Sequence, residues 1–233
     1  GLICFPYNII GCGGGEDPYD YYTSFFSQKL NGDESFRPFY YTSYRFLYDE
    51  MEPVSTKEIT SEEWAGYTDN KVSKKDVKQF VLKYSYKQLS TLYYNIEKKQ
   101  ALSLPDSVKR NSFTQWFMQN KDLEALGYLM YAKQVEPFVT GDEDMWADIN
   151  RDGEKMKKLA KNGIQLWTVA KNDFIKLRFG YQITRLAHYS EQYKDCIIYY
   201  DTYIKPNSTT SVLQDLASGL KAGALKHLGK REE

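Results

Sequence analysis

The pattern that comes nearest to a known chemical site is Asp148-x-Asn150-x-Asp152-Gly153. Oxygen-bearing side chains at alternate positions, followed by glycine, make up the first half of a calcium-binding loop. Such a loop closes on a glutamate at its twelfth position, whereas this chain has Leu159 there. We therefore expect no metal in this loop. The alternative to a calcium site is a polar loop whose Asp152 caps the helix that follows.

Other residue types that catalyse reactions are sparse or wrongly spaced. The two histidines, His188 and His227, form no zinc motif, and we expect His188 at a helix end, where a cation interacts favourably with the helix dipole. The glycine run at 13–15 lacks the Lys-Ser/Thr of a phosphate-binding loop. Adjacent carboxylates such as Glu62 and Glu63 are too common to indicate hydrolysis. The sequence therefore predicts no catalytic residues, no metal and no cofactor, and hence no enzyme.

Composition and charge argue against two further classes of function. The 233 residues carry 31 basic and 31 acidic side chains, and no basic stripe marks a nucleic-acid-binding surface. No run approaches the roughly 20 apolar residues of a membrane span. Hydrophobic residues make up 42% of the chain, which is enough for a core, and the count of 21 tyrosines is high. Because most of these tyrosines fall on apolar rows, we expect them to fill that core.

The first residues indicate export. Residues 9–12, Ile-Ile-Gly-Cys, have the form of a bacterial lipoprotein box, in which Cys12 would carry the lipid. One alternative is a disulfide between Cys4 and Cys12, formed in an oxidising compartment. Another is that Gly1 is a remnant of expression and that a lipid-bearing cysteine lay upstream. We expect a periplasmic or outer-membrane surface protein, in contact with the membrane only through a lipid anchor.

Aromatic residues dominate the stretch that follows. Residues 17–72 contain dense aromatic runs, at 17–26 and 36–48, but lack long helical periodicity. We interpret residues 1–72 as an irregular N-terminal segment that is held to a helical body by its rings, with a short helical turn beginning at Ser61. The alternative is an aromatic platform for carbohydrate.

Helical periodicity predominates in residues 73–233, which we interpret as an all-α domain of stacked antiparallel hairpins. Ser73 opens a capping-box variant, and Pro105 and Pro137 break the chain. The predicted helices cover residues 73–100, 121–136 and 153–170, with a shorter helix after Pro105.

Two amphipathic patterns between residues 173 and 206 meet at a tight polar turn, residues 190–192. The second pattern has an aromatic residue after the turn, then a small residue, another aromatic residue and a final proline; these are Tyr193, Cys196, Tyr200 and Pro206. In these places the pair resembles a tetratricopeptide repeat, although its first helix lacks the Trp and Leu-Gly signature of that family. The resemblance implies helical hairpins stacked as a right-handed solenoid.

A second copy of this unit begins at Leu220, where a helix rich in small residues leads to Gly229. The sequence stops at Glu233, so we interpret the domain as truncated at its C-terminal end. The small residues at 222–224 would admit a close partner, which we expect to be a helix after Glu233. Without that helix, apolar residues such as Leu225 would seek another surface.

As a whole, the chain resembles a group of exported lipoproteins from Gram-negative gut anaerobes, themselves similar to tetratricopeptide proteins. The likeness rests on the lipoprotein-like start, the aromatic run from Asp17 and the helix pair at 173–206. Helical arrays present a concave surface made by their first helices, so we expect a non-enzymatic scaffold with a groove for a protein or peptide partner. The alternative is a glycan-binding outer-membrane lipoprotein of a polysaccharide-utilisation system, which exposed coplanar rings would favour.

Overall fold

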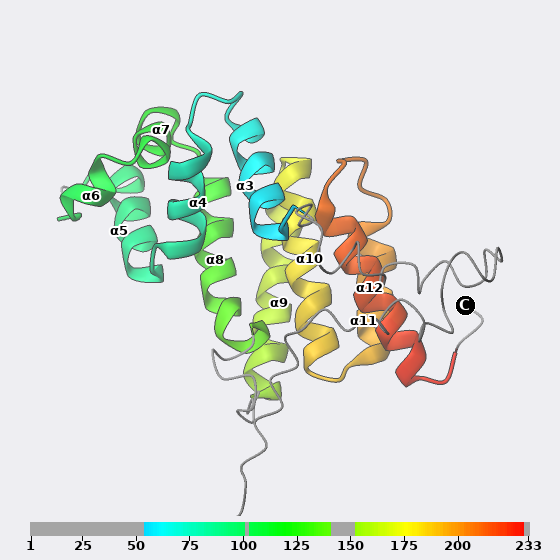
Figure 1. Ribbon diagram of the computed structural model, residues 1–233. Helices are drawn as coiled ribbons and strands as arrows, with labels where there is room; N and C mark the ends of the chain where they lie inside the picture. Colours follow the sequence, from blue (N-terminus) through cyan, green and yellow to red (C-terminus); the bar gives the residue numbers. More distant parts are fainter. Residues whose placement is uncertain (1–53, 101–102, 141–151, 231–233) are drawn as a thin grey trace, which may run out of the picture. The chain divides into compact units, whose positions relative to one another are not determined.

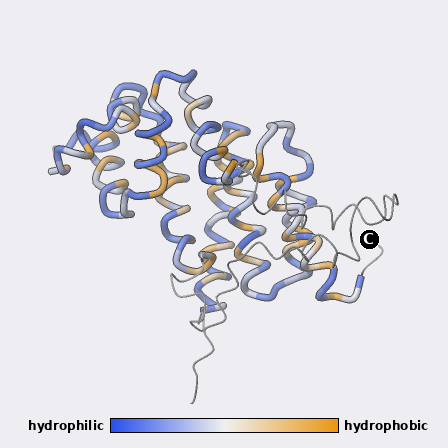
Figure 2. Tube along the Cα trace, viewed as in Figure 1, coloured by the Kyte–Doolittle hydropathy of each residue, from blue (hydrophilic) through white to orange (hydrophobic). Residues whose placement is uncertain are grey.

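The computed structural model describes residues 54–100, 103–140 and 152–230, which lie in one compact unit, Val54–Glu233. These residues form helices, with no strand among them (Figure 1). The predicted all-α class is therefore confirmed for the described ranges. Figure 2 shows hydrophobic and hydrophilic positions alternating along the helices, as burial of one face requires. In chain order the elements are α3 (Thr56–Tyr67), α4 (Lys74–Lys83), α5 (Tyr86–Glu97), α6 (Asp106–Lys109), α7 (Ser112–Asn120), α8 (Leu123–Val139), α9 (Gly153–Val169), α10 (Asp173–Tyr189), α11 (Tyr193–Tyr199), the π-helical turn η2 (Tyr200–Ile204) and α12 (Val212–His227).

Helix α3 lies inside the stretch 1–72, for which the sequence predicted irregular structure with a short helical turn at Ser61. It is a 12-residue helix, and the hydroxyl of Ser55 caps its first turn. Its inner face buries Trp64, which is 1% exposed, so the compact helical unit already begins at residue 54. The aromatic runs that precede it lie outside the described residues.

The predicted single helix over residues 73–100 is wrong, because α4 and α5 stand in its place. Ser73 caps the first of them, as predicted. Tyr84 then takes an extended conformation (φ −74°, ψ 139°), and its buried ring packs against Phe80. Ser85 begins α5 with a complete capping box. A buried ring and a new cap together end one helix and start the next.

The prediction that Pro137 ends its helix is also wrong. Helix α8 continues through it to Val139, and the Thr140 N–H closes the last turn on the Glu136 carbonyl (3.0 Å). Proline removes one backbone N–H, but Val139 is only 2% exposed, and burial of that side chain favours continuing the turn. The break at Pro105 is as predicted, since α6 begins directly after it.

Helix α10 is the central element of the described unit, packed against α8, α9, α11 and α12 (Figure 1). Ile175 and Ile183 of this helix are fully buried. The chain reverses at residues 190–192, where Glu191 has a positive φ of 60°, and α11 then runs on into η2. The predicted helix pair is therefore confirmed, including its turn.

Two of the three small residues of α12, Gly223 and Ala224, pack against described helices, so the expectation of a downstream partner helix is wrong for these two, whereas Ala222 is exposed. Ala224 is fully buried in one cluster with Cys196 of α11. A side chain added at Gly223 would come within 2.9 Å of His188 Cε1 in α10. These small residues therefore allow α12 to approach α10 and α11 closely. Leu225, 7% exposed, is covered as well.

Candidate functional site

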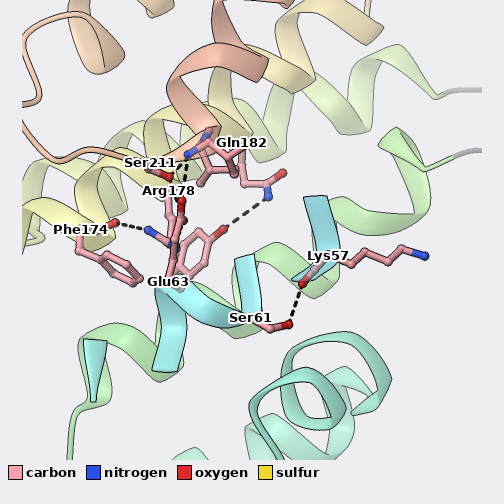
Figure 3. Close-up of polar contacts among 10 residues, drawn as sticks. Lys57, Ser61, Glu63, Phe174, Arg178, Gln182 and Ser211 are labelled. Carbon is pink, nitrogen blue, oxygen red and sulfur yellow. Dashed lines mark hydrogen bonds and ion pairs between the residues drawn. The ribbon is translucent and has the colours of Figure 1, made fainter. Parts of the chain in front are cut away.

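The buried charged side chain of the described core is Arg178 of α10, which is 1% exposed. Its Nη2 donates to Glu63 Oε2 of α3 (2.6 Å), and its Nη1 donates to the Phe174 carbonyl (3.3 Å; Figure 3). The guanidinium carbon also lies 3.3 Å from the centroid of the Phe174 ring. Burial lowers the pKa of Arg178 to about 10, and the nearby Glu63 carboxylate opposes that shift, so the side chain is charged at neutral pH.

Glu63 links three helices through its carboxylate. Its Oε2 also accepts a hydrogen bond from Ser211 Oγ (2.9 Å), and its Oε1 accepts one from the Val212 N–H (2.9 Å; Figure 3). Val212 is the first residue of α12, where the partial positive charge of the helix end suits a carboxylate. Three donors from α10 and the start of α12 therefore converge on one side chain of α3, an arrangement typical of a structural link.

Aromatic side chains beside this ion pair extend the contact of α3 with α8 and α10. Trp64 stacks on Tyr128 of α8 (centroids 6.0 Å apart, 26° between planes) and meets the Phe174 ring edge-on (5.0 Å, 84°). The Tyr67 hydroxyl donates to Asp122 Oδ2, at the start of α8 (2.6 Å). Helix α3 therefore covers the N-terminal ends of α8, α10 and α12, and a partner would have to bind elsewhere on the described unit.

Several residues singled out in the sequence have plain structural roles. Asp152 caps α9 by accepting a hydrogen bond from the Lys155 N–H (3.0 Å), as the alternative to a calcium loop predicts. His188 lies in the last turn of α10, as predicted, and meets the Tyr193 ring edge-on (5.8 Å). The His227 ring stacks on the same Tyr193 ring, with the centroids 4.3 Å apart and 5° between the planes. Within the described ranges, no three His, Cys, Asp or Glu side chains are grouped so as to hold a metal.

Cys196 is the remaining nucleophile of interest in the described part of the chain. Its side chain is fully buried, and burial raises the pKa of its thiol to about 12, so the thiol is protonated and unreactive at neutral pH. The candidate site residues Cys4, Cys12, Asp148 and Asn150 lie outside the described residues.

An open groove of about 860 Å³ lies beside α12, between that helix and η2. Its apolar part consists of Tyr200, Ala222 and Leu225, and lysines supply most of the remainder. The described lining therefore combines a small apolar area with several lysines. The lining residues are Tyr200, Lys205, Ser218, Lys221, Ala222, Leu225, Lys226 and Lys230.

Sequence reasoning missed this groove because its lysines follow no helical row. Lys205 comes from the end of η2, whereas Lys221, Lys226 and Lys230 are five and then four positions apart along and just after α12. Only the packing of η2 against α12 brings them to one surface. Sequence reasoning also missed Glu63 and Arg178, whose partners are distant along the chain.

Comparison with models of protein families, with curated proteins and with solved structures finds no match to this chain. None of the helices that the structure describes has both the length and the apolar composition that crossing a bilayer requires. The function is therefore inferred from the groove and from the packing of the helices that form it.

Proposed function

We propose that the protein is a non-enzymatic scaffold that binds a protein or peptide partner in the groove beside α12. The observation that carries this proposal is the groove itself, whose described lining combines Tyr200, Ala222 and Leu225 with lysines. Its described lining contains no histidine, cysteine or carboxylate. Such a surface suits reversible binding.

The packing of α8 to α12 supports a tetratricopeptide-like solenoid as the scaffold. In chain order α8 and α9, and then α10 and α11, would be the successive pairs, and α12 stands where the first helix of a third pair would. α10 contacts both helices of the preceding pair, its own partner and α12. This is the set of neighbours expected in stacked helical repeats, where each repeat contacts only the next.

Within the described ranges, the arrangement of rings favours a protein partner over the glycan alternative. A carbohydrate platform needs exposed, coplanar aromatic side chains. Tyr94, which is exposed, meets Tyr93 at 86°, and the stacked pair of Trp64 and Tyr128 is buried in the core. The groove beside α12 contributes one ring, Tyr200, among its lysines.

The scaffold acts in the periplasm or at the outer-membrane surface, anchored by a lipid on Cys12. The lipoprotein-like residues 9–12, and the exported group that the sequence resembles, support this part of the proposal. A disulfide between Cys4 and Cys12 is the alternative state of these cysteines in the same compartment.

Filling the groove tests the proposed function. Ala222 is exposed and lines the groove, so Ala222→Trp fills it with an indole, whereas Gly219→Trp places the same group in open space on the same helix. Peptides selected from a random library on the full chain should bind Ala222→Trp about tenfold or more weakly, a loss of roughly 1.4 kcal/mol, and bind Gly219→Trp as before. A library without enriched binders, or binders that ignore Ala222→Trp, would contradict the proposal.

A further inference from the structure

We infer that the groove beside α12 takes an acidic segment of a partner protein, a stretch that combines several carboxylates with at least one apolar side chain. This inference rests on the proposed function, because it names the chemistry of the partner that the scaffold would bind.

The charge of the groove is the first argument. The chain as a whole is neutral, with 31 basic and 31 acidic residues, yet half of the described lining residues are lysines and none of them is acidic. Asp201 neutralises one of these lysines, Lys221 (2.9 Å). Lys205 and Lys226 form no ion pair with a carboxylate in the described ranges. The groove therefore has a local excess of positive charge that a ligand within about 8 Å would experience at physiological salt.

The apolar part of the groove is the second argument. Leu225 is 7% exposed and lies beside Ala222, which is exposed, and Tyr200. Lys221 Nζ lies 5.0 Å from the centroid of the Tyr200 ring, so the ion pair and this contact hold that ammonium in place. A ligand that fits both features carries negative charge and an apolar side chain in the same short segment.

The kind of cation argues for carboxylates rather than a phosphate polymer. Phosphate is bound best by forked arginine donors or by the N–H groups of a helix N-terminus. None of the described lining residues is an arginine, and α12 contributes to the groove from Ser218 onwards, beyond its first turn. Each lysine ammonium acts as a point charge that a single carboxylate can meet. The apolar strip would also have no counterpart in a phosphate backbone.

The test measures binding of a labelled peptide to the full chain by fluorescence anisotropy. The probe alternates Glu with Ser around a central Leu, and its matched counterpart has Gln in place of Glu. The groove variant is Lys205→Gln with Lys226→Gln. Its control is Lys87→Gln with Lys161→Gln, which makes the same charge change at exposed positions of α5 and α9. Thermal melts of both variants establish that each is folded.

We expect the Glu peptide to bind about tenfold more tightly than the Gln peptide, and more weakly as salt increases. The groove variant should lose affinity for it by about 3- to 20-fold, because each exposed charge contact contributes a factor of a few, while the control should keep it. Equal affinity for the two peptides would overturn the inference but leave the proposed function standing. The same conclusion would follow if neither peptide bound while library panning yielded other binders.

Two further outcomes would also overturn the inference. In the first, inorganic polyphosphate displaces the Glu peptide at equal charge, and its affinity falls more than that of the peptide when Lys205 and Lys226 are changed. That result would identify a phosphate polymer as the ligand. Sedimentation that shows a dimer of the parent chain, lost in the groove variant, would identify a second copy as the occupant. Panning that yields no binders at all would contradict the proposed function itself.

Discussion

Glu63 and Arg178, 115 residues apart in the sequence, form an ion pair with 2.6 Å between Oε2 and Nη2. Their side chains are 15% and 1% exposed, so the charge of each is stabilised mainly by its partner and little by water. The Ser211 hydroxyl and the Val212 N–H bond to the same carboxylate. One side chain of α3 therefore holds α10 and the beginning of α12.

Glu63→Ala should destabilise the protein by about 3–5 kcal/mol, because it leaves the guanidinium of Arg178 buried without its partner. For a chain of this size that loss lowers the melting temperature by roughly 2–4 °C per kcal/mol. The neighbouring Glu62 pairs with Lys74 at the surface (2.7 Å), so Glu62→Ala should cost only about 0–1 kcal/mol. Urea denaturation of both variants measures the difference. Equal decreases in the free energy of unfolding would show that the buried ion pair contributes no more than the surface pair.

Tyr131 makes the stability depend on alkaline pH. Its hydroxyl donates to the Leu159 carbonyl (2.9 Å), and burial raises its pKa well above the ordinary value of 10.0. As the pH rises above 10.0, the unfolded chain loses this proton before the folded chain does, so the stability that Tyr131 contributes is present below that pH and lost above it.

Tyr131→Phe should therefore lower the free energy of unfolding by about 0.5–1.5 kcal/mol at neutral pH. Above pH 10.0 the free energy of unfolding of the variant should fall less steeply than that of the parent, with slopes that differ by about 1.4 kcal/mol per pH unit. Tyr86→Phe, at an exposed tyrosine, is the control. Denaturation curves across this pH range provide the measurement. A variant that declines as steeply as the parent would refute the assignment.

Gly163 allows α9 to pack closely against its neighbours. A Cβ at this position would lie 2.8 Å from Tyr131 Cζ and 2.9 Å from Ile183 Cγ1, and both of these side chains are buried. We expect Gly163→Ala to destabilise by about 1–3 kcal/mol. Gly219 in α12 has open space around it, and Gly219→Ala should stabilise by about 0.5–1 kcal/mol, because alanine favours a helix. Thermal melts of the two variants should shift in opposite directions, and parallel shifts would exclude the close contact as the cause.

Calcium should leave the melting temperature unchanged, because Leu159 cannot complete a calcium loop. Asp152→Ala should lower that temperature slightly, since it removes the cap of α9, and by the same amount with calcium or with a chelator. Calorimetric titration of the parent chain is the direct measurement. Heat from calcium binding that disappears in Asp152→Ala would mean that the loop is a metal site after all.

A lipid on Cys12 should be detectable by fractionation in the source organism. The parent protein should partition into the detergent phase and carry the mass of an attached lipid, whereas Cys12→Ser should appear in the aqueous phase. Cys4→Ser should behave as the parent does. If both variants stay aqueous, like the parent, and the parent gains two thiols on reduction, the disulfide alternative is correct.

The parts of the fold that the sequence alone determined are those that depend on neighbouring residues. Ser73 and Asp152 cap their helices through N–H groups within three positions, and Pro105 breaks the chain at its own position. The helix pair at 173–206 follows from apolar spacing together with one polar turn. Residue type and spacing are sufficient for such features, because the interactions that produce them lie within one or two helical turns.

The tertiary structure decided what depends on burial between distant segments. Helix α8 continues past Pro137 because Val139 is buried, and Lys205 joins the lysines of α12 only where η2 packs against that helix. In the sequence, Glu63 is one of two adjacent acidic residues with nothing to distinguish it from Glu62. The fold buries Glu63 against Arg178 and leaves Glu62 in solvent. That difference arises from the packing of helices more than one hundred residues apart, and no short window of sequence contains the free energy that decides it.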